Sequence, residues 1–320
     1  MISKLFCWLA FSFAFAAFSA EQPSKALARE ANILARPNDS IVWPDSTNDV
    51  QFRLYTNAAP DSPRLFNTFE LEAYGEILLP SPGGDRLQQW LVTSPADPLL
   101  HNIVVDGKGP ALNSTNRITF IEEASAAEWR YIAFDLTAPY RDRLKEYRRA
   151  ILYIQPDLFV LWDHLVAQKT INFQMLIHPP ATTVVDAVWG DLRLEMPKAG
   201  FLIHAPAARR KPRNWERIES AADKILPGTQ TMRLGPTNQF AELDLLTVFA
   251  VHRAGEKKDF AFRLLESQSA VGARIHRQGL PTLVAFKTDF AAPGASLTGF
   301  NFSGPVSVDV FRPKPTKASK

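Results

Sequence analysis

The sequence predicts an all-β protein, built as one large antiparallel β-sandwich (a supersandwich). Short apolar or alternating runs recur from about residue 48 onward, separated by clusters of Gly, Pro, Asn and Asp. This rhythm is typical of antiparallel sheets rather than of alternating strands and helices. The chain has 320 residues, of which 46% are hydrophobic, and no low-complexity block interrupts it. A chain of this size and composition can bury one large core.

The first element, residues 1–20, is expected to be a signal peptide. Lys4 supplies a positive charge, LFCWLAFSFAFAAF supplies an apolar segment, and small residues follow at the cleavage site. The apolar run is barely long enough to span a bilayer, which favours cleavage over retention as an anchor. We therefore expect a periplasmic or secreted bacterial protein without a membrane span. Its only cysteine, Cys7, lies in the signal, so the mature chain has no disulfide or cysteine ligand.

Residues 21–47 are expected to form an N-terminal segment with a short helix, because apolar residues follow helical spacing within 24–35. The sandwich is expected over residues 48–311, and a basic disordered tail over 312–320. The predicted strands lie within residues 49–56, 67–79, 101–107, 117–123, 129–136, 148–165, 170–179, 191–196, 200–205, 243–253, 281–290 and 307–312.

The strongest strand signal, residues 148–165, is broken at Gln155-Pro156-Asp157, because proline cannot donate a hydrogen bond within a sheet. Two strands joined by a turn are therefore expected there. One short helix in a long loop is predicted within residues 214–226, where apolar residues form a single helical stripe. This stripe consists of Trp215, Ile218, Ala222 and Ile225.

Composition and motifs exclude several classes of function. The formal net charge is only +3, so charge gives no general reason to expect nucleic-acid binding. No G-x-S-x-G segment and no phosphate-binding glycine loop is present. The six histidines form no closely spaced pair, so the sequence shows no self-evident metal site.

Two segments carry residues that could perform chemistry. His101 precedes a β-branched run and a turn at Asp106-Gly107. Tyr147 and Arg149 would share one face of a strand and could together hold a carboxylate, although a solvent-facing charge cluster is the favoured interpretation. The adjacent carboxylates Glu122 and Glu123 alternate across a strand and are expected to face water.

Four segments, in their order and spacing, resemble the C-terminal β-domain of heparinase II/III-type polysaccharide lyases. They are FNTFELEAYGEILLPSPGG (66–84), HNIVVDGKGP (101–110), YRRAILYIQPDLFVLWDHL (147–165) and LIHPPA (176–181). The resemblance covers roughly residues 40–255. It implies a relation to carbon–oxygen lyases that cleave uronate-containing polysaccharides, such as glycosaminoglycans or alginate, by β-elimination. In that reaction a base removes the proton beside the sugar carboxylate, the carboxylate is neutralised, and a Tyr protonates the leaving oxygen.

The resemblance also implies a zinc site in some members, and this chain departs from it. Aligning Asn67-Thr68-Phe69 on the N-S-F element of those members places DSPRL (61–65) where the His and Asp residues are expected. Ser81 or Pro82 stands where the ligand Asp is expected. His101 is then a remnant ligand position, and no cofactor is expected unless other residues substitute to hold zinc.

These enzymes also carry an N-terminal α/α toroid, for which residues 21–47 leave no room. We therefore expect a domain that associates with acidic polysaccharide, alone or with a separately encoded toroid subunit, and that does not catalyse by itself. The alternatives are an active lyase with a non-standard residue set and a structural envelope protein. The candidate catalytic residues are Tyr147, Arg148 and Arg149. The candidate sugar contacts are Asn67, Tyr74, Tyr147, Arg148, Arg209 and Arg210, the last two in a basic loop (208–213) that could equally be a solvated surface loop.

Overall fold

The computed structural model describes a mostly β chain. The described residues are 40–43, 49–55, 68–80, 101–111, 118–186, 191–205, 215–220, 223, 227–235, 239–256, 260–277 and 280–310. The chain divides between Arg36 and Pro37 into two compact units, and every described residue belongs to the second. Several antiparallel sheets and one short helix, α3 (Thr137–Tyr140), make up the described part, so the all-β prediction is confirmed. The expected signal peptide, N-terminal helix and basic tail lie outside the described residues.

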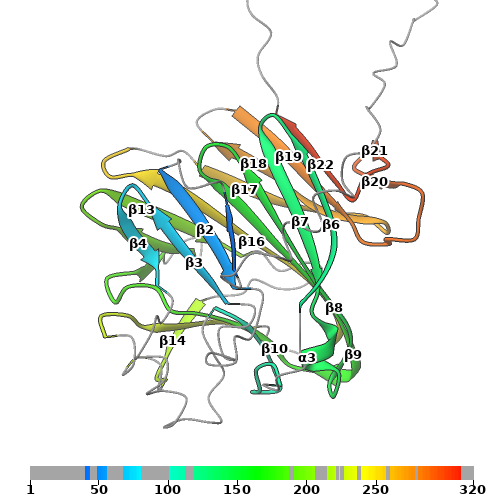
Figure 1. Cartoon of the computed structure of the whole chain (residues 1–320), viewed down its shortest axis with the longest axis horizontal. Helices are drawn as coiled ribbons and strands as arrows, with labels where there is room; N and C mark the ends of the chain where they lie inside the picture. The colour runs from blue at the N-terminus through cyan, green and yellow to red at the C-terminus, as the bar shows by residue number, and fades with distance from the viewer. Residues whose placement is uncertain are drawn as a thin grey trace, which may run out of the picture. The chain divides into compact units, whose positions relative to one another are not determined.

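An eight-stranded antiparallel sheet, here called the central sheet, organises the unit (Figure 1). Its two longest strands, β9 and β16, pair with each other near its middle. In spatial order its strands are β11 (Val184–Val185), β12 (Leu192–Glu195), β13 (Ala199–His204), β16 (Phe240–Arg253), β9 (Leu158–Ile171), β8 (Leu144–Ile154), β7 (Trp129–Asp135) and β6 (Thr119–Ala126).

Two four-stranded sheets share a hydrophobic core with one face of the central sheet. The first contains β1 (Ser40–Trp43), β2 (Val50–Tyr55), β3 (Phe69–Ala73) and β4 (Glu76–Leu79). The second contains β14 (Trp215–Ile218), β15 (Thr231–Leu234), β10 (Phe173–Ile177) and β5 (Ile103–Val105).

A third four-stranded sheet, here called the outer sheet, packs against the opposite face of the central sheet. It contains β17 (Phe260–Glu266), β18 (Ala270–Arg277), β19 (Leu280–Lys287) and β22 (Val306–Val310). The hairpin of β20 (Ala295–Leu297) and β21 (Phe300–Phe302) packs on its other side.

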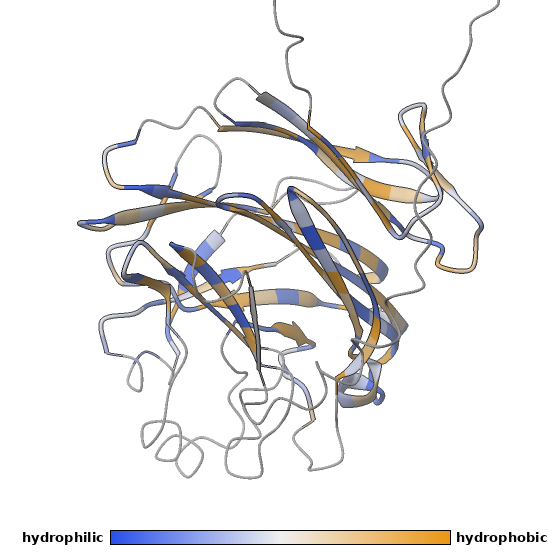
Figure 2. Ribbon diagram, turned by 45° about the horizontal axis from the view of Figure 1, so that its top comes forward, coloured by the Kyte–Doolittle hydropathy of each residue, from blue (hydrophilic) through white to orange (hydrophobic). Residues whose placement is uncertain are grey.

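Burial on both faces explains why the middle strands have continuous apolar runs. All eight residues from Leu158 to Leu165 are buried. Phe159 and Leu161 belong to the core on one face of the central sheet, while Val160 and Trp162 belong to the core on the other. A strand covered on both sides has no solvent face that would require alternation. Figure 2 shows hydrophobic residues distributed over the strands of the packed sheets.

The predicted break in residues 148–165 is confirmed, because β8 ends at Ile154 and β9 begins at Leu158. The helix predicted within 214–226 is wrong at its start, where Trp215–Ile218 form β14 and pair with β15. Trp215 is buried in the core while the next two residues are exposed, so this segment meets the rest of the molecule as a strand and not as a helical stripe. The sandwich also begins earlier than residue 48, because β1 pairs with β2.

No helix in the described part of the chain combines the length and apolar character needed to cross a membrane.

Candidate functional site

His101 lies fully buried at the start of β5, with a positive backbone φ of 46°. Its Nε2 donates a hydrogen bond to the carbonyl oxygen of Pro80 at 2.9 Å, and its Nδ1 accepts one from the backbone N–H of His178 at 3.2 Å. The ring stacks on Phe69, with centroids 4.9 Å apart. Burial lowers the pKa of His101 to about 4, although the bond to Pro80 opposes this, so the ring is neutral at pH 7.

The geometry of His101 does not fit a zinc ligand. Both ring nitrogens are held by backbone groups, so neither offers a lone pair to a metal. The positions at 61–65, Ser81 and Pro82, where the resemblance would place the other ligands, lie outside the described residues. His101 therefore fixes the entry into β5.

His178 lies beside His101, with ring centroids 5.7 Å apart, and burial lowers its pKa well below the usual range. The hydroxyl of Thr231 donates to Asp223 at 2.6 Å, so it can only accept from Nδ1–H of His178 at 3.0 Å. The Nε2 of His178 is then an unprotonated nitrogen, buried without a hydrogen-bond partner. Both histidines are neutral groups of the protein interior.

Tyr147 and Arg149 are also fully buried. Arg149 lies directly opposite Asp163 in the β8–β9 pair and donates to its two carboxylate oxygens at 2.7 and 3.2 Å. The hydroxyl of Tyr147 donates to the same carboxylate at 3.0 Å. Burial is the largest influence and disfavours the charged guanidinium, but the carboxylate of Asp163 together with the phenols of Tyr147 and Tyr140 outweighs it and raises the pKa of Arg149. The expectation that Tyr147 and Arg149 face solvent is wrong, because both side chains are fully buried. The carboxylate that they hold is that of Asp163 in the same chain.

Tyr140 joins this ion pair to the segment around His101. Its hydroxyl lies 3.1 Å from Oδ1 of Asn102 and 2.8 Å from the carbonyl oxygen of Ile103. Its ring meets that of Tyr147 edge-on at 5.1 Å. We call Asn102, Tyr140, Tyr147, Arg149 and Asp163 the buried motif network. It connects two of the four segments that carry the family resemblance, 101–110 and 147–165, and all five of its side chains are buried.

Asp163 and Tyr140 were not among the predicted site residues. A signal for Asp163 is present in the sequence, because a hairpin that turns at Pro156 pairs residues equally distant from the turn, which places Arg149 opposite Asp163. Tyr140 lies in α3, and no motif singled it out.

Arg148 projects from the opposite face of the central sheet. It lies in a row with His164 and Asp244 across β8, β9 and β16. Its guanidinium lies 3.8 Å from the ring centroid of Phe290 and pairs with Glu146 at 2.6 Å. The central sheet therefore separates the side chain of Arg148 from those of Tyr147 and Arg149, its neighbours in sequence.

Glu122 lies on the same face, and the expectation that it faces water is wrong. It is half-buried rather than turned to water, and it accepts a hydrogen bond from the hydroxyl of Tyr131 at 3.2 Å. Burial raises the pKa of Glu122, although the bond from Tyr131 opposes this.

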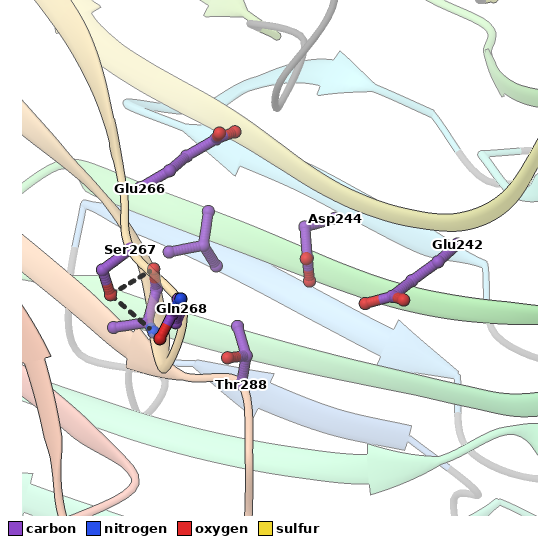
Figure 3. A pocket seen from close by; sticks show the side chains of 8 residues that line it. Glu242, Asp244, Glu266, Ser267, Gln268 and Thr288 are labelled. Carbon is purple, nitrogen blue, oxygen red and sulfur yellow. Dashed lines mark hydrogen bonds between the residues drawn. The ribbon is translucent and has the colours of Figure 1, made fainter.

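A small cavity lies between the central and outer sheets, next to Asp244 (Figure 3). Figure 3 shows Glu242 and Asp244 side by side, and Ser267 and Gln268 in the turn that follows β17. The cavity has a volume of about 40 Å³, and one water molecule needs about 10–15 Å³ of such volume. It therefore holds a few water molecules but no sugar ring. Its carboxylates would also repel a uronate or sulfate group. It is lined by Glu242, Asp244, Glu266, Ser267, Gln268, Ala270, Val271 and Thr288.

Tyr74 lies in a different place, in the turn between β3 and β4, with a backbone φ of 52°. The guanidinium of Arg253 lies 4.2 Å from its ring centroid, and Arg253 pairs with Asp49 at 2.5 Å. A Cβ on Gly75 would lie 3.8 Å from Nζ of Lys198. Burial raises the pKa of the Tyr74 phenol, with Asp157 adding to this and Arg253 opposing it. We call Tyr74, Lys198 and Arg253 the turn cluster.

The structure thus separates the predicted site residues. Tyr147 and Arg149 lie together in the buried motif network, Arg148 projects from the other face of the sheet, and Tyr74 lies in the turn cluster. Asn67, Arg209 and Arg210 lie outside the described residues. Lys198 and Arg253 were not predicted, because Arg253 reaches Tyr74, and Lys198 reaches the adjacent Gly75, only through tertiary folding.

Solved lyases share this fold. Heparan sulfate lyase HepC from Pedobacter heparinus matches with a TM-score of 0.60 and 12% identity, over 79% of this chain and 41% of that one. Heparinase III matches with a TM-score of 0.57 and 14% identity, over 74% and 39%. A further heparinase III gene product matches with a TM-score of 0.60 and 11% identity, over 78% and 41%. No protein-family model and no curated protein matches the sequence significantly.

The likeness to these lyases is a likeness of fold, because the identities are low. The chain spans about two fifths of the length of the solved structures it matches. The resemblance noted in the sequence is therefore confirmed for the β-domain architecture of heparinase III-type lyases.

Proposed function

We propose that this chain is an exported domain that binds acidic, uronate-containing polysaccharide and does not cleave it alone. The shared fold with heparan sulfate lyases supports the choice of ligand class. The burial of Tyr147 and Arg149 against Asp163 supports the proposal that the chain does not cleave this polymer alone. A phenol for proton transfer and a guanidinium for carboxylate neutralisation are the residue types that β-elimination needs, and here both are engaged inside the protein.

The turn cluster is the binding surface we propose. It presents an aromatic ring and two cationic side chains from three different turns or strand ends. The side chain of Arg253 is 55% exposed, and Lys198 is exposed. Cationic groups beside a half-buried ring suit the carboxylates or sulfates and the apolar faces of a uronate polymer. The carboxylate-lined cavity between the sheets has the wrong charge for this ligand.

Catalysis would then require a partner. A separately encoded α/α-toroid subunit could supply the base and the acid, with this chain holding the polymer. The apolar leader supports export to the periplasm or beyond the cell. Binding through the turn cluster requires no cofactor, and His101 plays no part in it as a metal ligand.

Electrophoresis in gels cast with heparan sulfate, alginate or chondroitin tests the proposal. We expect the chain to be retarded by at least one of these polymers and to migrate freely in a gel cast with a neutral glucan. Free migration in all of them would contradict polysaccharide binding and favour a structural envelope role.

A pair of double variants tests the surface. Lys198→Ala/Arg253→Gln removes two charges from the turn cluster and should abolish most of the retardation. Lys169→Ala/Arg274→Gln removes two charges from exposed positions on β9 and β18 and serves as the matched control. Equal loss in both double variants would show that only net charge matters, and would contradict the turn cluster as the site.

A further inference from the structure

Three side chains that could hold a metal ion lie together on the face of the central sheet opposite the buried motif network. His164 on β9 lies directly across from Asp244 on β16, and Glu242 is two residues before Asp244 on the same face. One ligand atom from each of these three residues lies within 4.8 Å of the other two. Nδ1 of His164 and Oδ1 of Asp244 are 2.9 Å apart.

This spacing suits a small divalent ion. Ligand atoms about 2.0–2.2 Å from zinc in a tetrahedral site lie roughly 3.3–3.6 Å from one another. His164 and Asp244 are already close to this spacing, and a bound ion would replace the hydrogen bond that now joins Nδ1 to Oδ1. Glu242 is exposed, so its side chain can close the remaining gap without moving the backbone.

Two of the three ligands are held in place. The side chain of His164 is only 9% exposed. The indole Nε1–H of the fully buried Trp162 donates to the carboxylate of Asp244 at 3.0 Å and orients it. Such a hydrogen bond to a ligating carboxylate is a common feature of metal sites in proteins.

The same sheet offers two comparisons. His204 pairs with Asp191, and His252 pairs with Glu195, each as one histidine with one carboxylate. Among the described residues, only the His164 pair gains a third ligand. It is also the pair whose carboxylate lines the water-sized cavity, where a water molecule could complete the coordination.

We propose that His164, Glu242 and Asp244 bind a divalent metal ion of the zinc class, with water from the cavity as the fourth ligand. One imidazole nitrogen and two carboxylate oxygens favour zinc or cobalt over calcium and magnesium, which prefer oxygen ligands alone. The site lies on the opposite face of the central sheet from His101. It is also independent of the proposed polysaccharide binding, because the turn cluster contributes nothing to it.

Calorimetric titration of the metal-free full chain with Zn²⁺ tests this site, with Ca²⁺ and Mg²⁺ as comparison ions. We expect one Zn²⁺ per chain, and binding of Ca²⁺ or Mg²⁺ at least tenfold weaker. Co²⁺ in place of Zn²⁺ should give the visible absorption of a four-coordinate site. His164→Gln and Glu242→Gln should each weaken Zn²⁺ binding at least tenfold, while His252→Gln should leave it unchanged.

Several results would overturn the proposal. They are the absence of stoichiometric Zn²⁺ binding, tighter binding of Ca²⁺ than of Zn²⁺, an affinity that Glu242→Gln leaves unchanged, and an equal loss in His252→Gln. Glu242 is exposed, so the Glu242→Gln result is decisive even if His164→Gln does not fold.

Discussion

Arg149 and Asp163 form an ion pair whose side chains are both 0% exposed. A charge in this position is tolerated only because its partner and the hydroxyl of Tyr147 compensate for the lost water. At the residue scale, this makes the motif a stability element, and its contribution can be measured.

Asp163→Asn should therefore destabilise the fold by about 3–5 kcal/mol, because it leaves the guanidinium of Arg149 buried without a counter-charge. Urea unfolding monitored by circular dichroism measures this change. The control is Glu146→Gln, which removes the carboxylate that pairs with Arg148 where both side chains are partly exposed. That change should cost less than about 1 kcal/mol. Equal effects of the two substitutions would contradict the structural role of Asp163.

His101 makes stability depend on pH. Its pKa is about 4 in the folded chain and about 6.5 in an unfolded one, so between these values only the unfolded chain takes up the proton. Stability should be fully present above pH 6.5 and should fall as the pH drops toward 4, by about 3 kcal/mol from His101. His178 acts in the same direction, because its pKa is also lowered by burial.

Free energies of unfolding at several pH values test this dependence. His101→Gln should cost about 1–2 kcal/mol at pH 7 through altered hydrogen bonds. It should reduce the loss of stability between pH 6.5 and pH 4, and leave metal content unchanged. A variant that keeps the full pH dependence of the wild type would contradict the assignment.

At the scale of elements, β18 passes close to its neighbours at Gly272. A Cβ at this position would lie 2.1 Å from the carbonyl oxygen of Val284 and 2.6 Å from Leu297. The outer sheet and the hairpin of β20 and β21 can approach each other only because this position has no side chain.

Gly272→Ala should destabilise the chain by about 1–3 kcal/mol through overpacking. Gly304→Ala is the control, because its Cβ would lie 3.4 Å from the carbonyl oxygen of Val306, the nearest atom beyond its chain neighbours. That substitution should change stability by less than about 0.5 kcal/mol. Thermal unfolding of the two variants compares them, and an unaffected Gly272→Ala would contradict the close packing.

The elements differ in how far the sequence predicts them. Strands β8 and β9 are predicted together with their break, because proline and the apolar runs act locally. The segment Trp215–Ile218 is not predicted correctly. Its apolar residues fit helical spacing, but in the structure it pairs with strand β15 as part of a sheet. Tertiary pairing overrides a local periodicity there.

At the scale of the whole molecule, the sequence predicts one sandwich, and the structure has a central sheet covered on both faces. Periodicity alone does not distinguish a strand buried on two sides from other apolar segments. The same topology decides the candidate site. It turns Arg148 and Arg149 to opposite faces. It also brings Arg253 to Tyr74 and Lys198 to the adjacent Gly75, and neither outcome follows from motif spacing.

We propose that the residues carrying the family resemblance support the fold and do not cleave polysaccharide in this chain alone. Ultraviolet absorbance of unsaturated uronate products tests it most directly, with the purified chain incubated with the polymer that retards it in gels. We predict no rise in absorbance over the polymer alone, with or without added Zn²⁺. A rise that scales with the concentration of this chain would contradict the account.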